Sequence, residues 1–234
     1  NNIAGEAGIQ ENLDGFTIKV ESISKKDFIA WGSVVDNKTG DASFINDQIK
    51  QNNKTLIMGV AHTKGALNTN WRTDLNIYNP SSSQLNLILK YYQYGNSNYP
   101  KTTGIPVPPG GIVIADDVLS KFQNISENEA GFIIATPDPD YPIDKKPIIS
   151  ARTYNELGLD GTYGQFVSGL DFENGGANPG QKLYFSGITI NADFRANLGL
   201  LNADSENSNT ITVSLYSKNG SPVSSFQEVL PAKS

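Results

Sequence analysis

A short motif that occurs twice constrains this chain more than any other feature. Residues 70–79 return in modified form as residues 192–202. In both, an aromatic residue precedes an arginine, a small residue and an Asp or Asn follow, then a leucine, and an asparagine closes the run. In the first copy Trp71, Leu75 and Ile77 alternate with polar side chains, which is the period of a β-strand. The sequence therefore predicts two related units, each containing this strand.

Short segments of alternating polarity, separated by turn residues, continue along the whole chain. We expect strands at residues 16–21, 28–36, 55–62, 71–79, 85–94, 111–114, 131–136, 147–155, 163–169, 182–187, 194–202, 210–217 and 226–230. A helix is expected at residues 117–122, with Asp116 as its N-terminal cap. Residues 1–14 are expected to be irregular, and residues 44–54 to form a short helix or a linker. This spacing predicts an all-β fold of immunoglobulin-like β-sandwiches.

The composition argues against several classes of function. The chain has 234 residues, room for one large domain or two domains of about 117 residues each. Its formal net charge of -6 argues against binding to nucleic acid, whose phosphates require clustered Lys and Arg. The absence of cysteine excludes disulfide bonds and Cys-ligated zinc. No apolar run approaches the roughly 18 residues of a membrane-spanning helix, so no membrane span is expected.

The first unit is complete, whereas the second is divided between the two ends of the sequence. In the first unit the motif is followed by residues 131–134, 150–155 and 160–167. The counterparts of these three segments are residues 15–18, 32–37 and 39–45, which precede the first unit. Arg72 precedes Gly131 by 59 positions, and counting from Arg195 to the last residue and on to Gly15 gives 54.

Two domains are expected on this basis. The first, residues 55–170, is a continuous β-sandwich, and the second combines residues 1–50 with residues 180–234. A half-sandwich exposes an apolar face and an unpaired strand edge, so it requires completion. The completing half comes either from the same chain, with the termini close together, or from the next molecule in a head-to-tail fibre. A third alternative is an excerpt from a longer tandem array, cut out of phase.

A family resemblance rests on segments spread over most of the chain. They are residues 71–75, 79–80, 107–111, 117–119, 150–155 and 160–166. This set resembles a repeat of secreted bacterial proteins, which occurs there in tandem pairs whose second member ends in a run like residues 33–41. The resemblance implies an extracellular or cell-surface setting and an immunoglobulin-like sandwich, and it brings no catalytic residues. The phase differs from that family, because here the end of the second member comes first.

The repeated arginines are the first candidates for a structural or binding role. Arg72 and Arg195 occupy the same place in the two copies of the motif, and Asp74 and Asn197 follow them at the same spacing. Because the two arginines share this position, we expect them to have the same structural role. We expect each arginine to pair with Asp74, Asp36 or a backbone carbonyl, because its guanidinium carries a fork of donors.

Two tyrosines are candidates for binding. Tyr154, with Arg152, occurs in one unit only; a ligand contact and a tyrosine that anchors a strand corner are both possible, and the second is favoured. Tyr94 belongs to the tyrosine-rich residues 91–99. If alternate tyrosines point outward they can stack on sugars or on a neighbouring subunit. The favoured interpretation is that Tyr91 lies in the core and the others are ordinary strand residues.

Metal binding and catalysis receive little support. Asp138, Asp140 and Asp144 lie in a Pro-rich loop and are weak candidates for calcium, which requires six to eight oxygen ligands. Two lysines follow directly, so a solvated loop without any cofactor is favoured. The single histidine, His62, does not suffice for a hydrolase triad or a His-rich metal site.

The sequence therefore predicts that the protein is not an enzyme. We expect an extracellular structural or surface protein that acts through assembly or adhesion, with head-to-tail self-association into a filament as one form. The alternative is a carbohydrate- or protein-binding module of a secreted protein, whose partner is a polysaccharide or a surface protein.

Overall fold

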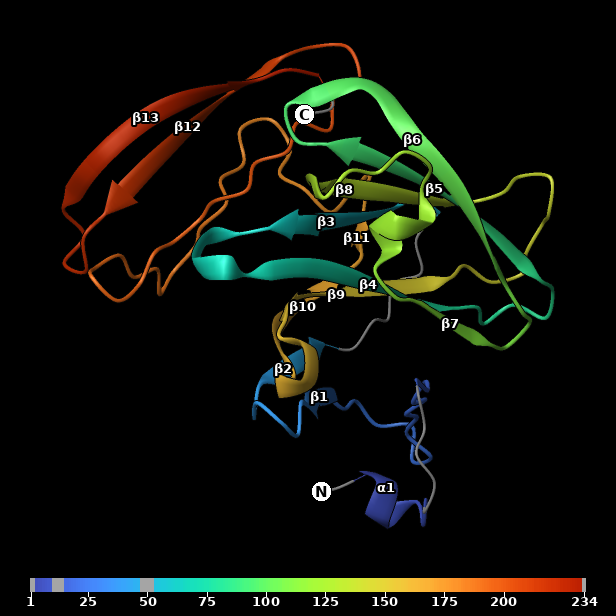
Figure 1. Ribbon diagram of the computed structural model, residues 1–234. Helices are drawn as coiled ribbons and strands as arrows, with labels where there is room; N and C mark the ends of the chain where they lie inside the picture. Colours follow the sequence, from blue (N-terminus) through green and yellow to red (C-terminus); the bar gives the residue numbers. More distant parts are fainter. Residues whose placement is uncertain (1–2, 10–14, 47–52, 233–234) are drawn as a thin grey trace.

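A computed structural model describes residues 3–9, 15–46 and 53–232, and the regular secondary structure of these residues is almost entirely β-strand (Figure 1). The strands are β1 (Trp31–Val35), β2 (Ala42–Asn46), β3 (Thr55–Lys64), β4 (Asn70–Tyr78), β5 (Leu85–Gln93), β6 (Asn96–Val107), β7 (Ile112–Ala115), β8 (Asn128–Pro137), β9 (Ile148–Glu156), β10 (Thr162–Ser168), β11 (Leu170–Asp171), β12 (Asn209–Tyr216) and β13 (Pro222–Leu230). The helical segments are α1 (Ile3–Glu6), η1 (Ala66–Asn68), η2 (Val118–Lys121) and η3 (Gly158–Asp160). The predicted all-β class is confirmed.

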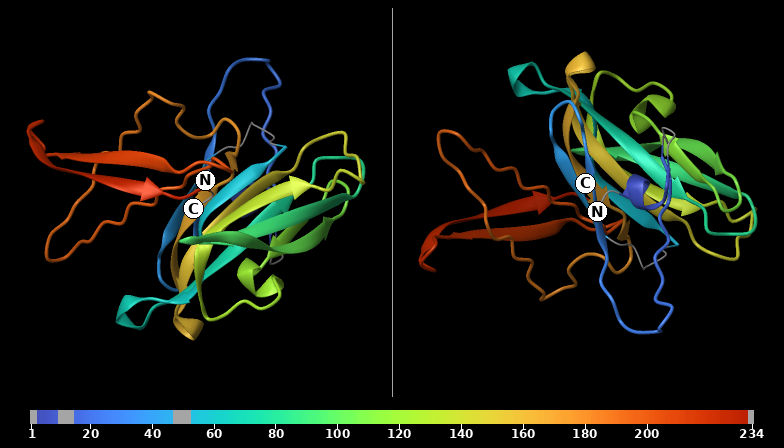
Figure 2. Two further views of the ribbon diagram at one scale, coloured as in Figure 1. Left: turned by 90° about the horizontal axis from the view of Figure 1, so that it is seen from above. Right: turned by 90° about the horizontal axis from the view of Figure 1, so that it is seen from below.

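Nine strands form one antiparallel sheet in the order β10-β9-β4-β3-β8-β5-β6, with β7 paired to β4 and β11 paired to β3. The sheet is strongly curved (Figure 2), and its part around β4 and β9 packs across the core from its part around β5 and β8. Along most of β4 and β5, buried residues alternate with less buried ones. This alternation determines which face of each strand turns towards the core. Shifting the register of either strand by one residue would turn its apolar side chains outward.

The enclosed core draws on both halves of this curved sheet and on the η2 segment. Its buried members are Ile57, Val60, Leu75, Ile77, Leu85, Leu87, Leu89, Tyr91, Val107, Ala115, Val118, Leu119, Phe122, Ile133, Ala135, Ile149 and Ala151. Tyr91 is buried in it, as the favoured interpretation of the tyrosine-rich strand predicted. A smaller apolar cluster on the outer face joins Phe132 of β8 to Leu170, Phe172 and Leu201.

Two buried threonines hold β3 against the strands from which it diverges. β3 pairs with β4 only at Thr63 and Lys64; β4 pairs further along with β7, and β9 lies along its other edge from Trp71 onwards. In the gap, the Thr73 hydroxyl accepts a hydrogen bond from the Ala61 N–H at 2.9 Å. The Thr153 hydroxyl lies 2.9 Å from that of Thr73 and donates to the Gly59 carbonyl at 3.1 Å. These side chains replace ladder hydrogen bonds that would otherwise be missing from a buried region.

The N-terminal hairpin β1–β2 is a separate two-stranded sheet that packs on β10 through polar contacts. The Asp36 carboxylate accepts hydrogen bonds from the N–H and the hydroxyl of Thr162, both at 2.8 Å. Asp41 accepts from the Gly164 N–H at 2.8 Å and from the Arg152 guanidinium at 3.3 Å. A Cβ at Gly164 would lie 2.6 Å from the Cβ of Tyr154, so this strand position requires glycine.

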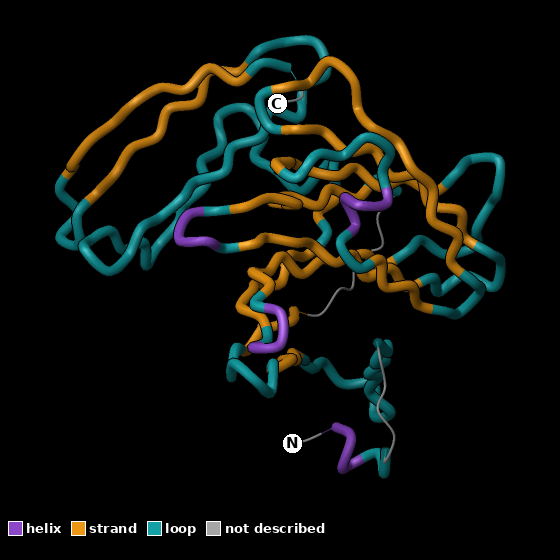
Figure 3. Tube along the Cα trace, in the orientation of Figure 1, coloured by secondary structure: helices purple, strands orange, loops and turns teal. Residues whose placement is uncertain are grey.

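The C-terminal hairpin β12–β13 is a third sheet, which projects from the side of the molecule (Figure 1). Residues 172–208 connect it to β11 without helix or strand, as the tube in Figure 3 shows. The strands expected at residues 182–187 and 194–202 are therefore wrong for this chain, as is the strand at residues 16–21. Their alternating patterns are present, but a strand also needs a neighbour for its backbone hydrogen bonds.

Other expectations differ in detail. β1 begins at Trp31, later than expected, and the short helix α1 lies within residues expected to be irregular. The helix predicted at residues 117–122 is the 3-10 segment η2, and its N-terminal cap is Asp117 rather than Asp116. Residues 44–46 belong to β2, and the rest of the expected helix or linker reaches residues 47–52, outside the described part.

Among the described residues, the two parts of the predicted second domain do not pair with each other. They form separate sheets, β1–β2 and β12–β13. Of the described residues in these end segments, Ser43 and Asn202 are buried, and most large apolar side chains are exposed. Joining of the two parts stays a prediction.

Candidate assembly surfaces and a polar cluster

One asparagine contact is built twice in the molecule. Asn79, after β4, donates from Nδ2 to the carbonyl of Val107 and to that of the proline after it, both at 3.1 Å. Asn202 donates in the same way to Leu230 at 3.3 Å and to the proline after it at 3.0 Å. Both asparagines and both first acceptors are 123 positions apart. The hairpin β12–β13 is therefore bound by Asn202 in the same way as the hairpin β5–β6 is bound by Asn79.

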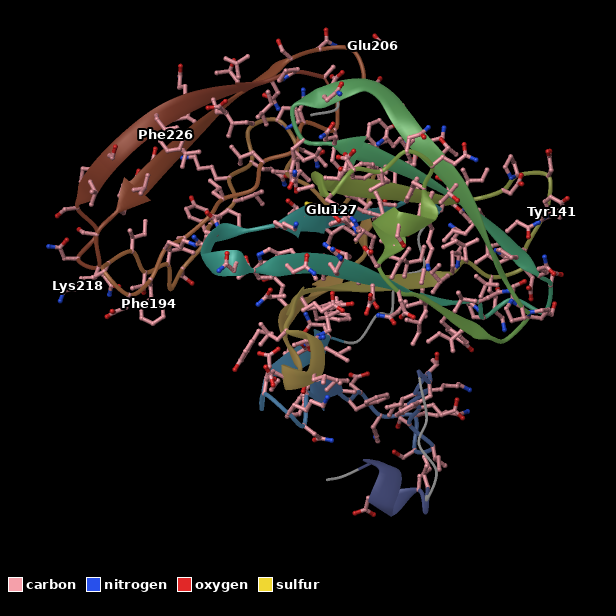
Figure 4. All side chains as sticks on the ribbon, viewed as in Figure 1. Glu127, Tyr141, Phe194, Glu206, Lys218 and Phe226 are labelled. Atoms are coloured by element: carbon pink, nitrogen blue, oxygen red, sulfur yellow. The ribbon has the colours of Figure 1, made fainter. Side chains whose placement is uncertain are left out.

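The C-terminal hairpin presents an uncovered apolar face. Val213 and Phe226 are paired across it, and Leu215 lies on the same face. In β5 the equivalent face is fully buried: Leu89 and Tyr91 are 0% and 1% exposed, whereas Leu215 is 37% and Phe226 50% exposed. Figure 4 shows Phe226 on this projecting arm. The apolar face of β12–β13 therefore resembles that of a core strand, but no other element covers it among the described residues.

The N-terminal hairpin has a second such face, opposite the one that docks on β10. Trp31 and Phe44 stack with ring centroids 5.6 Å apart, and Val35 lies on the same side of the hairpin. Trp31 is 68% exposed and Phe44 is 54% exposed. Exposed patches of this kind on a β-protein mark interaction surfaces. The docking contacts hold the hairpin so that this face is free.

Protonation of Asp36 is expected to loosen this docking. Hydrogen bonds from the Lys38 backbone N–H and from the Thr162 side chain lower the pKa of Asp36 from 3.8 to about 2. Because the folded pKa is depressed, the stabilisation is complete above pH 3.8 and is lost as the pH falls towards 2. The amide protection factors of β1 and β2, which compare their exchange rates with those of unstructured amides at the same pH, should fall over that range. Asp36→Asn should remove this step, and unchanged protection of β1 and β2 down to pH 2 would contradict it.

Three predicted site residues meet in a polar cluster at the side of β4. The Asp74 carboxylate accepts hydrogen bonds from the Asp117 N–H at 2.8 Å and from the Tyr154 hydroxyl at 3.1 Å. Burial raises the pKa of Asp74, and burial beside Asp74 raises that of Tyr154. Asp117 adopts left-handed backbone angles, and its carboxylate lies 2.8 Å from His62 Nδ1 and 3.7 Å from Arg72 Nε. The contacts fix the turn before η2 onto β3, β4 and β9.

Arg72 has one partner of an expected kind and one that was not expected. Arg72 donates to a backbone carbonyl, that of Trp71, at 2.9 Å, as one of the three predicted options held. Its acidic neighbour is Asp117, which the sequence did not indicate because the two are 45 positions apart. Arg152 reaches Asp41 and lies 5.2 Å from the Tyr154 ring. Arg195 is exposed in a segment without strand, away from this cluster.

The remaining candidates lie apart from one another. Asp144 accepts hydrogen bonds from the Ser81 hydroxyl and the Ser82 N–H, and Asp138 from the N–H of Asp140. Among the described residues, no three His, Asp or Glu side chains gather as metal ligands would. Asn197 is exposed in the same segment as Arg195.

Tyr94 is 45% exposed beside a shallow groove between β3, β8 and residues 199–201. Its hydroxyl accepts a hydrogen bond from the Gly59 N–H at 3.2 Å. The neighbouring tyrosine, Tyr92, stacks on Phe132 with ring centroids 4.9 Å apart and is buried. Tyr91 and Tyr92 therefore offer no ring face to a sugar.

None of the helices in the described ranges combines the length and apolarity needed to cross a membrane. Neither a protein-family model nor a curated protein matches the sequence. A solved structure, described as the crystal structure of Thermotoga maritima 1070, overlays with a TM-score of 0.39 and 11% sequence identity, over 53% of this chain and 97% of that chain. A likeness of this size carries no argument about function.

Proposed function

We propose that this protein is an extracellular structural protein of two immunoglobulin-like units, whose molecules assemble head to tail. The C-terminal half-unit of one molecule is completed by the N-terminal half-unit of the next. The observation that carries the proposal is the asparagine contact built twice, at Asn79 and Asn202, because it supports a second unit of the same kind that lacks strands.

The missing strands correspond to segments at the other end of the chain. In the nine-stranded sheet, β5 lies between β6 and β8, and β9 lies between β10 and β4. Among the described residues, β12 has a strand neighbour on one side only, as does β1. Residues 15–18 match part of β8, and the β1–β2 hairpin matches β9–β10. Addition of these strands would satisfy open backbone edges and bury both apolar faces.

Completion by a second molecule is favoured by the placement of the two ends. The β1–β2 hairpin docks on β10 by hydrogen bonds, and the C-terminal arm leaves the outer face at Leu201, packed near Phe132. In Figure 1 the hairpin lies below the sheet and the β12–β13 arm extends from its side. A contact between unlike surfaces, repeated from molecule to molecule, builds an open fibre.

Mixing two defective variants tests the proposal. Trp31→Asp places a charge on the N-terminal face, and Val213→Asp places one on the C-terminal face. Each variant alone should remain monomeric, whereas the unaltered chain should form larger species as its concentration rises. An equimolar mixture should form a discrete dimer, because each variant retains the surface that the other lacks. Sedimentation velocity distinguishes these species.

A matched control is Tyr141→Asp, because Tyr141 is 54% exposed on a loop away from both faces (Figure 4). This variant should assemble like the unaltered chain. A chain that stays monomeric at every concentration would overturn the proposal. So would dimers of either variant alone, or a mixture of the two that remains monomeric.

A further inference from the structure

We infer the strand register of this assembly: residues 194–201 of one molecule form a strand antiparallel to β1 of the next, with Asn197 opposite Val34. The inference rests on the proposed function and specifies its contact. Residues 194–199 and most of β1 are exposed in the single chain, and β1 has a strand on one side only among the described residues.

The complete unit supplies the register. In it β4 pairs with β9, and Asp74 lies opposite Arg152. Residues 194–201 follow residues 71–78 by 123 positions, the spacing that also relates Asn79 to Asn202. Residues 32–37 precede residues 150–155 by 118 positions. Transferring the β4–β9 pairing through these two spacings places Asn197 opposite Val34.

Apolar side chains coincide on one face in this register. Leu200 falls opposite Trp31, and Ala196 falls opposite Val35. Leu198 lies on the same face and is 46% exposed in the single chain. The equivalent positions in β4 and β9 face the core of the complete unit, where Ile77 lies opposite Ile149. A slip by one residue would pair each apolar face with a polar one.

The same register also brings opposite charges together. Arg195 falls opposite Asp36, the place that Arg72 and Tyr154 hold in the complete unit. Opposite charges on directly facing residues of an antiparallel pair are favourable, whereas like charges would be unfavourable. The arginine of the repeated motif thereby acquires an acidic partner in its second copy as well.

Disulfide trapping can measure the register, because the chain contains no cysteine. Four single-cysteine variants suffice: Val34→Cys, Gly32→Cys, Asn197→Cys and Gly199→Cys. A side chain added at Gly32 or Gly199 meets no atom within 4 Å in the single chain. The matched mixtures are 34 with 197 and 32 with 199, and the crossed mixtures are out of register by two residues. Directly opposite Cα atoms lie about 4.5–5.5 Å apart, within disulfide range, whereas diagonal ones do not.

With dissolved oxygen as oxidant, both matched mixtures should give about tenfold more disulfide-linked dimer than the crossed mixtures, because association raises the effective concentration of the facing thiols. Concentration-dependent assembly with equal yields in all four mixtures would overturn the register and leave the proposed function standing. Absence of both assembly and preferential linkage would overturn the two together.

Discussion

Leu89→Ala is expected to lower the free energy of unfolding of the nine-stranded unit by about 2–5 kcal/mol, because it opens a cavity in a filled core. Leu89 is fully buried in β5. Val213 holds the equivalent position in β12, where it is partly exposed on a hairpin without a core. Val213→Ala should therefore change the stability of the dilute single chain by less than about 0.5 kcal/mol.

Urea denaturation of both variants at low protein concentration measures this contrast. The stability of the Val213→Ala chain should fall behind that of the unaltered chain only at concentrations at which molecules assemble, since burial then occurs at that position. An equally large loss for Val213→Ala in the monomer would mean that β12 already lies in a finished core, contrary to its exposure here.

Lys101→Met is expected to cost about 2–4 kcal/mol, because it removes the cation that faces a buried carboxylate. Glu129 is 5% exposed, and its Oε1 lies 2.9 Å from Lys101 Nζ. The Tyr91 hydroxyl donates to Oε2 at 3.1 Å, which alone does not neutralise the charge. Burial opposes ionisation of Glu129, but hydrogen bonds from Lys101 and Ser126 outweigh it and hold the pKa of Glu129 below its ordinary value.

The loss in Lys101→Met should depend on pH. In the unaltered chain the depressed pKa of Glu129 stabilises the fold above about pH 4.5, and this stabilisation fades as the pH falls. Without Lys101, burial dominates and the carboxylate is more easily protonated, which relieves part of the cost in acid. The difference between the two chains should shrink below about pH 4.5. Lys101→Met with Glu129→Gln is the control and should recover part of the loss, and equal costs at pH 4 and pH 7 would contradict this account.

Local pattern was sufficient to predict most of the strands that have partners in the chain, but not, for example, β6 (Asn96–Val107) or the two-residue strand β11, where no strand was expected. Alternation located β5 correctly, since residues 85–93 find β6 and β8 beside them. The same kind of alternation at residues 194–202 failed to produce a strand, because no neighbour in the described chain offers it hydrogen bonds. Pattern therefore indicates the capacity to form a strand, and topology decides whether that capacity is used.

The polar cluster was harder to predict than the strands. Arg72, Asp74 and Tyr154 were recognised as candidates, but their grouping with His62 and Asp117 depends on the β4–β9 register and on a left-handed residue before η2. His62 and Asp117 come from segments 55 positions apart. A single sequence carries no signal for such a distant pair. The docking of Arg152 on Asp41 likewise depends on where the N-terminal hairpin folds back.

The junction between β2 and β10 has a mechanical consequence. Its hydrogen bonds join Asp36 and Asp41 to Thr162, Gly164 and Arg152 at the edge of the sheet. In a fibre of the proposed kind, tension would pass from each completed unit to the next through this polar seam and through the peptide link to β3. A seam of hydrogen bonds and an ion pair yields to salt and acid more readily than an apolar core does. The fibre would bend first at this seam, and its stiffness would fall as the salt concentration rises or the pH falls.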